Sequence, residues 1–572
     1  MKKLISVIAV CAMTLSMTPI SFEAHASMSD WTITDGVLTI KGNGALPKYE
    51  DPRKIPWYDK KEEVTSLVLE GNITEITDQL FSGMKNLESV SFPDTVTSIG
   101  WQTFSNCTSL KEVNLPDSVK SIGNGSFGRC ENLESVSLPN GLETIDVWAF
   151  GECTNLKNIT IPDTVSSIGA YTFYKCTSLT DMTLPEKVTA LEEGLLQGCT
   201  SLQNFNAKGK IESVEGAVFS GTPWLLNQPG IVTYDGKWLL AYNGSEQEIK
   251  IPDGVTEICD YAFMNNENIA KVILPESVKM IGREAFLYSS LSELEMPAVE
   301  VIKDNAFSET PLKSITFPDT LQEIEGYTMQ NCKELTDVHF GSSMTEIPQG
   351  IFFYCDGLKT VTIPENIKEI KNMAFYDCKN LETVIFEGKE LDSMGSSVFH
   401  GCESLKSIVI PSGVSKIQEG TFYGCNALES VKIPESVTSI GTEAFYNCTN
   451  LKTITVPATV TEISKRALGY TYIKDTGYCL TDDFVIEGYL NSAADTYAKE
   501  NEITFSVLND SSLKGDVNAD GAFNVSDVIL LQKWLLAVPD THLANWKMAD
   551  FCEDDKLNVF DFCLMKKELL KG

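Results

Sequence analysis

The chain has 572 residues and a formal net charge of −34. It is too long for one ordinary globular core, and it is too acidic for a nucleic acid or an anionic lipid surface, because both partners need basic patches. After the first 17 residues, no stretch approaches the ~20 apolar residues that a membrane span requires.

The N-terminus has the features of a secretion signal. Lys2 and Lys3 precede an apolar run over residues 4–17, and Ala24-His25-Ala26 supplies a small-x-small cleavage site. We therefore expect residues 1–26 to be a signal peptide that is cleaved after Ala26. The mature protein is expected to be secreted and soluble, with no membrane insertion of its own.

A motif of 23 residues recurs about seventeen times between residues 70 and 475. It reads Pro-x-x-Val-x-x-Ile-Gly-x-x-x-Phe-x-x-Cys-x-x-Leu-x-x-Val-x-Leu, as in residues 116–138. One repeat is too short to bury its own apolar face, so the repeats must stack on one another. The motif resembles the bacterial surface-antigen class of leucine-rich repeats. It predicts a mostly β solenoid with short helical turns over residues 70–507.

The 16 cysteines follow this repeat and not a disulfide pattern. Asn266 and Ser289 occupy the same position of the motif as the cysteines. A position that accepts Cys, Asn or Ser favours a small buried group that hydrogen-bonds a turn, so we predict free, buried thiols. The cysteines in this position are Cys107, Cys130, Cys153, Cys176, Cys199, Cys332, Cys355, Cys378, Cys402, Cys425 and Cys448.

Three segments depart from the period. Residues 27–69 contain Trp31 and Trp57 and are expected to cap the N-terminal end of the solenoid, because terminal repeats must hide the open core. Residues 470–507 are expected to cap the other end. The period is also interrupted near residues 220–250, which indicates either a β-hairpin inserted into one solenoid or a boundary between two solenoids.

Aromatic side chains follow the motif Phe in five successive repeats. With coils ~4.8 Å apart, they would form a ridge roughly 20 Å long. Such a ridge could bind polysaccharide or a protein partner, or its rings could shield the turn and support the stacking of coils. Both interpretations remain open. The five residues are Phe353, Tyr376, His400, Tyr423 and Tyr446.

Two loops near the C-terminus carry oxygen ligands at the spacing that Ca²⁺ requires, and each is followed by an apolar helix pattern. In the first loop, Gly521 at position 6 permits the turn to close. The second loop begins 34 residues later. Candidate ligands in the first loop are Asp516, Asn518, Asp520, Asn524, Asp527 and the carbonyl of Ala522. Those in the second loop are Asp550, Asp554, Asn558, Asp561 and the carbonyl of Lys556.

Residues 513–572 resemble a type I dockerin, a small all-α calcium-binding module with two loop-helix repeats. The resemblance implies two Ca²⁺ sites. The second is degenerate, since Cys552 and Asp555 replace the expected Asn or Asp and Gly, and a neutral thiol is a poor Ca²⁺ ligand. It also implies a cohesin of a cellulosome scaffold protein as partner. The cohesin-facing positions correspond to Val525, Ser526, Lys533, Val559, Phe560 and Lys567.

Sequence patterns typical of catalysis are missing: the predicted mature chain has three scattered histidines and no HExxH, zinc cluster or GxSxG. We therefore predict a non-catalytic, secreted cellulosome component, associated with the cell surface through its scaffold. Its solenoid would bind protein or polysaccharide during plant polysaccharide breakdown. The alternatives are a glycoside hydrolase with an unrecognised site and an adhesin displayed on the scaffold.

Overall fold

The computed structural model describes residues 30–473, 477–508, 513–518, 522–539 and 541–571. The predicted signal peptide and three residues of the first calcium loop, Ala519, Asp520 and Gly521, lie outside these ranges. The chain divides into two compact units: Met1–Ser213 with Val218–Trp224, and Val214–Ala217 with Leu225–Gly572.

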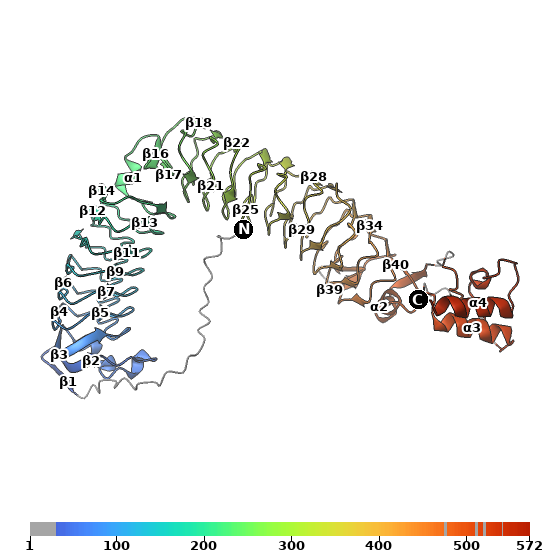
Figure 1. The fold of residues 1–572 in the computed structure, drawn as a ribbon, viewed down its shortest axis with the longest axis horizontal. Coiled ribbons are helices and arrows are strands. Elements are labelled where there is room, and N and C mark those ends of the chain that lie inside the picture. Colours follow the sequence, from blue (N-terminus) through green and yellow to red (C-terminus); the bar gives the residue numbers. More distant parts are fainter. Residues whose placement is uncertain (1–29, 474–476, 509–512, 519–521, 540, 572) are drawn as a thin grey trace. The chain divides into compact units, whose positions relative to one another are not determined.

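Both units contain β-solenoid coils, about 19 turns in total, which confirms the predicted leucine-rich-repeat fold. Within a unit, the strands of successive coils lie side by side (Figure 1). Each regular coil contributes two short strands, one of two to four residues before the motif Pro and one of two residues before the motif Gly. Equivalent strands of neighbouring coils pair in parallel, as β5 does with β7 and β6 with β8, in a series of short sheets.

The first unit begins with an antiparallel pair of strands, β1 and β2, and β2 pairs in parallel with the long strand β3. β3 starts both ladders, because its ends pair with β4 and with β5. The elements are β1 (Asp30–Thr34), β2 (Val37–Ala45), η1 (Pro52–Lys54), η2 (Tyr58–Glu63), β3 (Ser66–Ile76), β4 (Ser89–Ser91), β5 (Ser98–Ile99), β6 (Glu112–Asn114), β7 (Ser121–Ile122), β8 (Ser135–Ser137), β9 (Thr144–Ile145), β10 (Asn158–Ile159), β11 (Ser167–Ile168), β12 (Asp181–Leu184), β13 (Ala190–Leu191), β14 (Asn204–Ala207) and β15 (Ser213–Val214).

The second unit has one row of longer strands and one row of two-residue strands, and each row is divided into several sheets. The first comprises β18 (Glu248–Lys250), β20 (Lys271–Ile273), β22 (Glu293–Glu295), β24 (Ser314–Thr316), β26 (Asp337–His339), β28 (Thr360–Ile363), β30 (Thr383–Phe386), β32 (Ser407–Val409), β34 (Ser430–Lys432) and β36 (Thr453–Thr455). The second follows β17 (Trp238–Tyr242) with β19 (Glu257–Ile258), β21 (Met280–Ile281), β23 (Val301–Ile302), β25 (Glu323–Ile324), β27 (Glu346–Ile347), β29 (Glu369–Ile370), β31 (Ser393–Met394), β33 (Lys416–Ile417), β35 (Ser439–Ile440) and β37 (Glu462–Ile463).

The interval where the period fails contains a short helix and an antiparallel hairpin, α1 (Pro223–Leu226) and β16 (Ile231–Tyr234) with β17. Both ladders of the first unit end before it, at β14 and β15. New ladders begin with β17 and β18, and the division between the two units falls within α1. A hairpin and a break in both ladders therefore occur together here.

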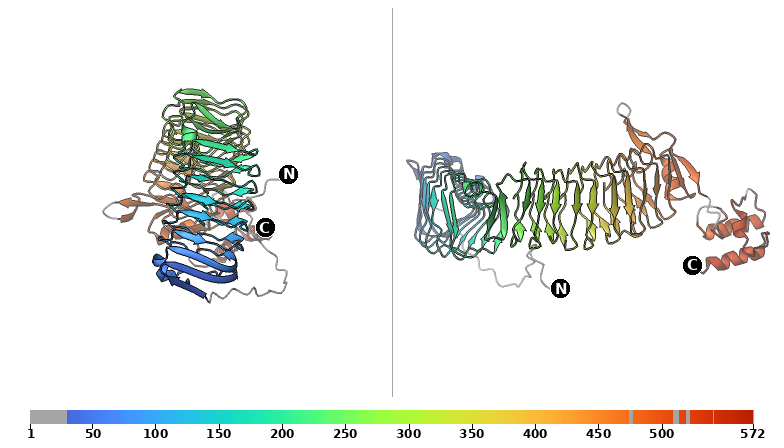
Figure 2. Two further views of the ribbon diagram at one scale, coloured as in Figure 1. Left: turned by 90° about the vertical axis from the view of Figure 1, so that its left-hand side faces the viewer. Right: turned by 90° about the horizontal axis from the view of Figure 1, so that it is seen from above.

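The solenoid of the second unit ends in a helix and two further strands, α2 (Ala493–Glu500), β40 (Val485–Gly488) and β41 (Thr504–Val507). Tyr497 and Ala498 of α2 join the buried core of the coils. A hairpin formed by β38 (Tyr470–Ile473) and β39 (Gly477–Leu480) projects from this end of the stack (Figure 2).

The core of each unit is a column of stacked rings. Phe104, Phe127 and Phe150 lie 5.4 and 5.5 Å apart between ring centroids, nearly parallel. The turn around such a Phe requires the left-handed backbone conformation twice: Trp148 and Glu152, two residues before and after Phe150, both have φ of 60°. Adjacent coils repeat this tight turn, so their rings stay in register.

The cysteines stabilise the same turns without forming disulfides. The Sγ of Cys130 donates to the carbonyl of Phe104 at 3.2 Å, and Cys425 makes the equivalent bond to Phe399 at 3.1 Å. Asn266 occupies this position in another coil and donates from Nδ2 to Tyr242. All cysteines of the described ranges are free, and the repeat cysteines are buried, so the prediction of free thiols is confirmed.

Thiol labelling of the native protein tests this core. Burial raises the pKa of Cys130 to about 12, and a protonated thiol without solvent access does not react. At pH 8 we expect rapid alkylation of Cys552 and Cys563, which are exposed, slower reaction of Cys479, and none at the twelve buried cysteines until denaturant is added. Peptide mass spectrometry would identify the labelled positions. Disulfide-linked peptides between neighbouring coils would contradict the arrangement.

Candidate functional site

The C-terminal segment is built from two copies of one loop-helix unit. Helices α3 (Val525–Leu535) and α4 (Val559–Leu569) pack on each other, with the 3-10 turn η3 (Trp546–Ala549) before the second loop. Both start with a capping box, in which an Asn accepts from the helix backbone and an Asp three residues later bonds back to the Asn N–H. A small separate core, which includes Val517, Leu531 and Met565, holds the two copies together.

In the first loop, the capping Asp also organises the loop backbone. Asp527 is fully buried and accepts from the N–H groups of Val517 at 3.1 Å, Asn518 at 3.3 Å and Asn524 at 2.9 Å. Asp516, the first residue of the loop, is 1% exposed. The loop therefore buries a carboxylate at each of its two ends.

The second loop has the same frame with different chemistry. Asp561 is fully buried and accepts from the N–H groups of Cys552 and Asn558, both at 2.9 Å. Burial raises the pKa of this carboxyl, but the N–H donors and the Cys552 thiol together outweigh burial and hold its pKa below the usual value. Asp555 has φ of 56°, the left-handed conformation that a Gly adopts without strain. Cys552 is exposed.

These donor sets fit Ca²⁺. Each loop supplies carboxylate, amide and carbonyl oxygens, which a hard divalent cation prefers. In the second loop, Asp550 and Asp561 are both buried, and neither forms an ion pair with any residue that the structure describes. Two buried carboxylates in one loop are unfavourable unless a cation compensates them. The cation would be held by Asp516, Asn518, Asn524, Asp527 and the Ala522 carbonyl in the first loop, with Asp520 completing the predicted set, and by Asp550, Asp554, Asn558, Asp561 and the Lys556 carbonyl in the second.

The six residues predicted to face a cohesin are all exposed. Phe560 is 70% exposed, Val559 60% and Val525 59%, and Ser526, Lys533 and Lys567 are also exposed. The sequence reasoning missed Ile529 and Leu564, which are exposed apolar residues one helical turn after Val525 and Phe560. Their i, i+4 spacing was the available signal.

The aromatic residues predicted as a ridge form a continuous stack in the second unit. Successive ring centroids of Phe353, Tyr376, His400, Tyr423 and Tyr446 lie 4.7, 4.2, 4.5 and 4.8 Å apart, with interplanar angles of 5° to 24°. Each of the three inner rings therefore has a neighbouring ring on both faces. Only ring edges remain for contact with a ligand.

Burial changes the chemistry of this aromatic row. It lowers the pKa of His400 below the ordinary value, so the imidazole is neutral at pH 7. Its Nδ1 has no hydrogen-bond partner among the described residues and lies 3.9 Å from Oδ1 of Asp377. At the C-terminal end, Tyr478 of the hairpin meets Tyr446 edge-on at 5.9 Å, and the guanidinium of Arg466 lies 4.1 Å from the Tyr478 ring centroid.

The model of the "BspA type Leucine rich repeat region" matches residues 57–153, 126–229, 236–359, 280–392 and 387–480. The chain belongs to this family. The model of the type I dockerin domain matches residues 514–570, so the C-terminal loop-helix pair is a type I dockerin. Type I dockerins bind calcium and dock to cohesins in assemblies of the cellulosome type, and leucine-rich-repeat solenoids bind proteins. Both families are non-catalytic, and no enzyme domain is detected.

Several solved structures are similar to this chain. A leucine-rich repeat protein from Bacteroides ovatus is 23% identical, over 84% of this chain and 98% of that chain, with a TM-score of 0.32. One from Eubacterium ventriosum is 22% identical, over 73% and 92%, with a TM-score of 0.35. The leucine-rich repeat protein of T. pallidum is 25% identical, over 34% and 86%, with a TM-score of 0.28. No curated protein matches the chain.

None of the helices within the described ranges combines the length and the apolar character that crossing a membrane demands.

Calcium removal and loop variants test the cation sites. Because an unfolded loop has no preformed site, the free energy of Ca²⁺ binding adds to the free energy of folding. We expect Asp516→Ala to unfold the dockerin far more than Asp550→Ala does, because the second loop already lacks two ideal residues. Calorimetric Ca²⁺ titration and circular dichroism with and without chelator would measure this. Equal losses from both variants, or a dockerin that stays folded in chelator, would contradict it.

Proposed function

We propose that this protein is a secreted, non-catalytic cellulosome component. Its dockerin attaches it to a scaffold cohesin in a Ca²⁺-dependent way, and its solenoid binds a ligand during plant polysaccharide breakdown. The observation that carries the proposal is the exposed apolar and basic face of α3 and α4, on helices whose first residues are set by the two oxygen-rich loops. Such a face has no structural role in the small core beneath it.

The two helices offer different surfaces to a cohesin. In α4, Val559, Phe560 and Leu564 present adjacent exposed apolar side chains, while the equivalent of Phe560 in α3 is Ser526. Large apolar side chains usually dominate the energy of an interface. The proposal is therefore that α4 anchors the cohesin and that the dockerin binds in one orientation.

Paired variants of the two helices test this anchor. Phe560→Ala is expected to weaken cohesin binding by about 2 kcal/mol or more, whereas Ser526→Ala, at the equivalent position of α3, changes it little. Isothermal titration against a panel of type I cohesins measures both. If Ser526→Ala has the larger effect, α3 is the anchor.

The ligand of the solenoid is proposed to be a protein or polysaccharide, with the aromatic row as one contact surface. A sugar stacks on an open ring face, and the inner rings of the row have none. A protein partner can instead pack on the exposed ring edges. The stacking thus favours protein binding at this surface and leaves polysaccharide to other parts of the solenoid.

A double variant separates binding from packing in the aromatic row. Tyr376→Ala with Tyr423→Ala is expected to lower the unfolding temperature modestly, because two stacked rings are lost, and to lower affinity for the solenoid partner by about tenfold. The control is Tyr288→Ala, which removes an exposed tyrosine outside the row. Retention on glycan, plant fibre and cell-wall fractions and binding to candidate proteins are measured. Lost stability with every interaction retained would mean that the row only supports packing.

Two other functions are weaker candidates. A glycoside hydrolase would need a pair of carboxylic acids across a substrate cleft, and both matched families are non-catalytic. An adhesin displayed on the scaffold would use the same dockerin contact with a ligand on another cell. Binding of the solenoid to plant fibre, as opposed to cell surfaces, distinguishes the adhesin from the main proposal.

A further inference from the structure

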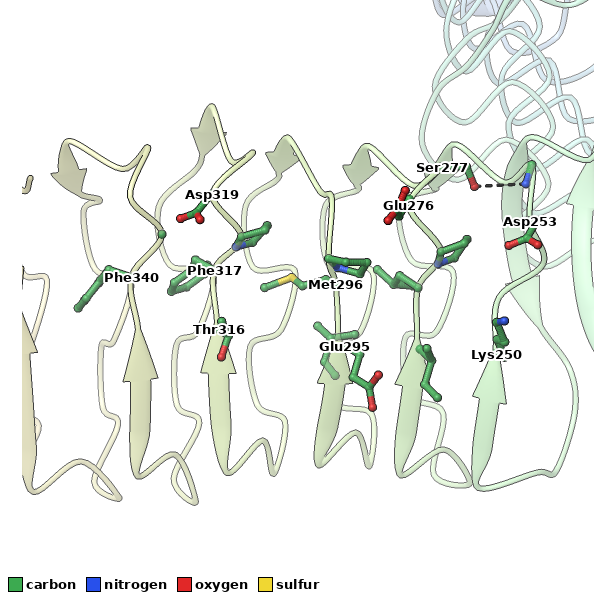
Figure 3. A pocket seen from close by; sticks show the side chains of 18 residues that line it. Lys250, Asp253, Glu276, Ser277, Glu295, Met296, Thr316, Phe317, Asp319 and Phe340 are labelled. Atoms are coloured by element: carbon green, nitrogen blue, oxygen red, sulfur yellow. Dashed lines mark hydrogen bonds between the residues drawn. The ribbon is translucent and has the colours of Figure 1, made fainter.

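A groove of about 1040 Å³ runs across successive coils of the second unit. It lies where the strands β18 to β26 end and the following turns begin, as the close view shows (Figure 3). It is separate from the dockerin and shares no residue with the aromatic row.

One turn along the groove is shorter than its neighbours. Two residues normally separate the motif Pro from the next core aliphatic residue, as in residues 275–278 and 318–321. Residues 297–299 reach Val299 after only Ala298. Ala298 follows Pro297 directly, so this coil has no carboxylate corresponding to Glu276 or Asp319, the side chains that stand at the outer edge of the adjacent turns (Figure 3). The missing residue leaves a hollow between them.

The floor of the groove is apolar. Ile273, Leu294 and Phe340 line it with partly exposed side chains, over the buried residues Met296 and Phe317. Ile273 stands at an outward strand position that Ser137 occupies in a regular coil of the first unit. An outward aliphatic side chain at this position adds apolar surface that the core does not need.

The rim is acidic. The rim carries four carboxylates and one cation. The carboxylates belong to Asp253, Glu276, Glu295 and Asp319, and the cation is Lys250. Glu295 is engaged by Lys271 at 2.8 Å, and Asp319 accepts from the N–H and hydroxyl of Ser342, both at 2.7 Å. Asp253 and Glu276 form no ion pair with any part of the chain that the structure describes. Two carboxylates are therefore available to a ligand with positive charge.

We propose that this groove binds an extended segment of a partner polypeptide that carries apolar side chains flanked by Lys or Arg. Five turns at ~4.8 Å per coil give a length of about 20 Å, which an extended peptide of roughly six residues spans at ~3.3 Å per residue. A glycan is less suited, because the floor is mainly aliphatic, the Phe317 ring is 2% exposed, and the partly exposed Phe340 ring stacks on Phe317 and meets Phe352 edge-on. The inference rests on the proposed role of the solenoid in binding, and it names the site and the chemistry of the partner.

The repeat supplies a matched control for the acidic rim. Residues 275–278 and 434–437 have the same sequence, Pro-Glu-Ser-Val, and Glu276 and Glu435 are both exposed. The turns on either side of residues 434–437 have full length, so Glu435 stands beside no shortened turn. Glu276→Lys and Glu435→Lys change the net charge of the protein equally, and only the first alters the groove.

The probe is a fluorescent ten-residue peptide of alternating Lys and Leu, with an alternating Glu and Leu peptide for comparison, titrated into the full-length protein. We expect the Lys-Leu peptide to bind, the Glu-Leu peptide not to bind, and Glu276→Lys to weaken binding about tenfold because a repulsive charge replaces an attractive one. Glu435→Lys should weaken it less than about twofold, as expected for a distant, screened charge. Failure of the Lys-Leu peptide to bind, or equal effects of the two variants, would overturn the proposal.

A second variant tests the shape of the groove without changing charge. Insertion of one Ser between Ala298 and Val299 restores the full turn length and should abolish peptide binding. Unchanged circular dichroism and cohesin affinity would show that the protein is folded. If the insertion disrupts the fold, the comparison of Glu276→Lys with Glu435→Lys still tests whether the groove binds the peptide.

Cellohexaose binding that is lost on insertion, with no peptide binding, would assign the groove to a glycan. Cohesin binding should stay constant in every arm, so failure here is distinct from failure of the dockerin proposal.

Discussion

No single coil of this protein can bury its own apolar face, and the rest of the structure follows from that constraint. Each coil presents a Phe, a Cys or its substitute, and several aliphatic residues to the next coil. The rings stack at about 5.5 Å between centroids, and each inner ring covers a face of the ring before it and of the ring after it. A misplaced ring in one coil would therefore expose a ring face in both neighbouring coils. The burial of apolar surface is thus shared between coils, as expected for a repeat protein, and the two ends require different residues to close the column.

The same constraint determines where binding surfaces can arise. Positions whose side chains are buried in the column accept few residue types. The residue after the motif Phe and the turn after the motif Pro lie outside the column, so they can vary without disrupting the core. In five coils, the residue after the motif Phe is aromatic or His, and these residues form the aromatic row. Burial keeps His400 neutral between two tyrosines of this row. In one coil, the turn after Pro297 lacks one residue, and this turn lies in the groove with the apolar floor. Both surfaces come from local departures within an otherwise regular stack.

The dockerin has only a small apolar core and is stabilised in a different way. Its buried apolar cluster contains few residues, and the module also buries Asp516, Asp527, Asp550 and Asp561. Backbone N–H donors compensate part of the charge of Asp527 and Asp561, and Ca²⁺ in the loops would compensate the rest. Cation binding, loop closure and the start of each helix are then a single event. In the proposed function, this coupling would make the cohesin contact at the beginning of α3 and α4 depend on Ca²⁺.

The sequence alone determined the repeat, the column of Phe and Cys positions and the two oxygen-rich loops, because each is a local pattern with a fixed period. The free thiols could be predicted from Asn266 and Ser289 in the cysteine position. The tertiary structure decided what depends on neighbouring coils. It showed that the inner rings of the aromatic row cover each other's faces, since ring orientation is set by stacking across coils and not by spacing along the chain. It also revealed the groove beside Pro297, because a one-residue deletion becomes a hollow only when full-length turns stand on both sides of it.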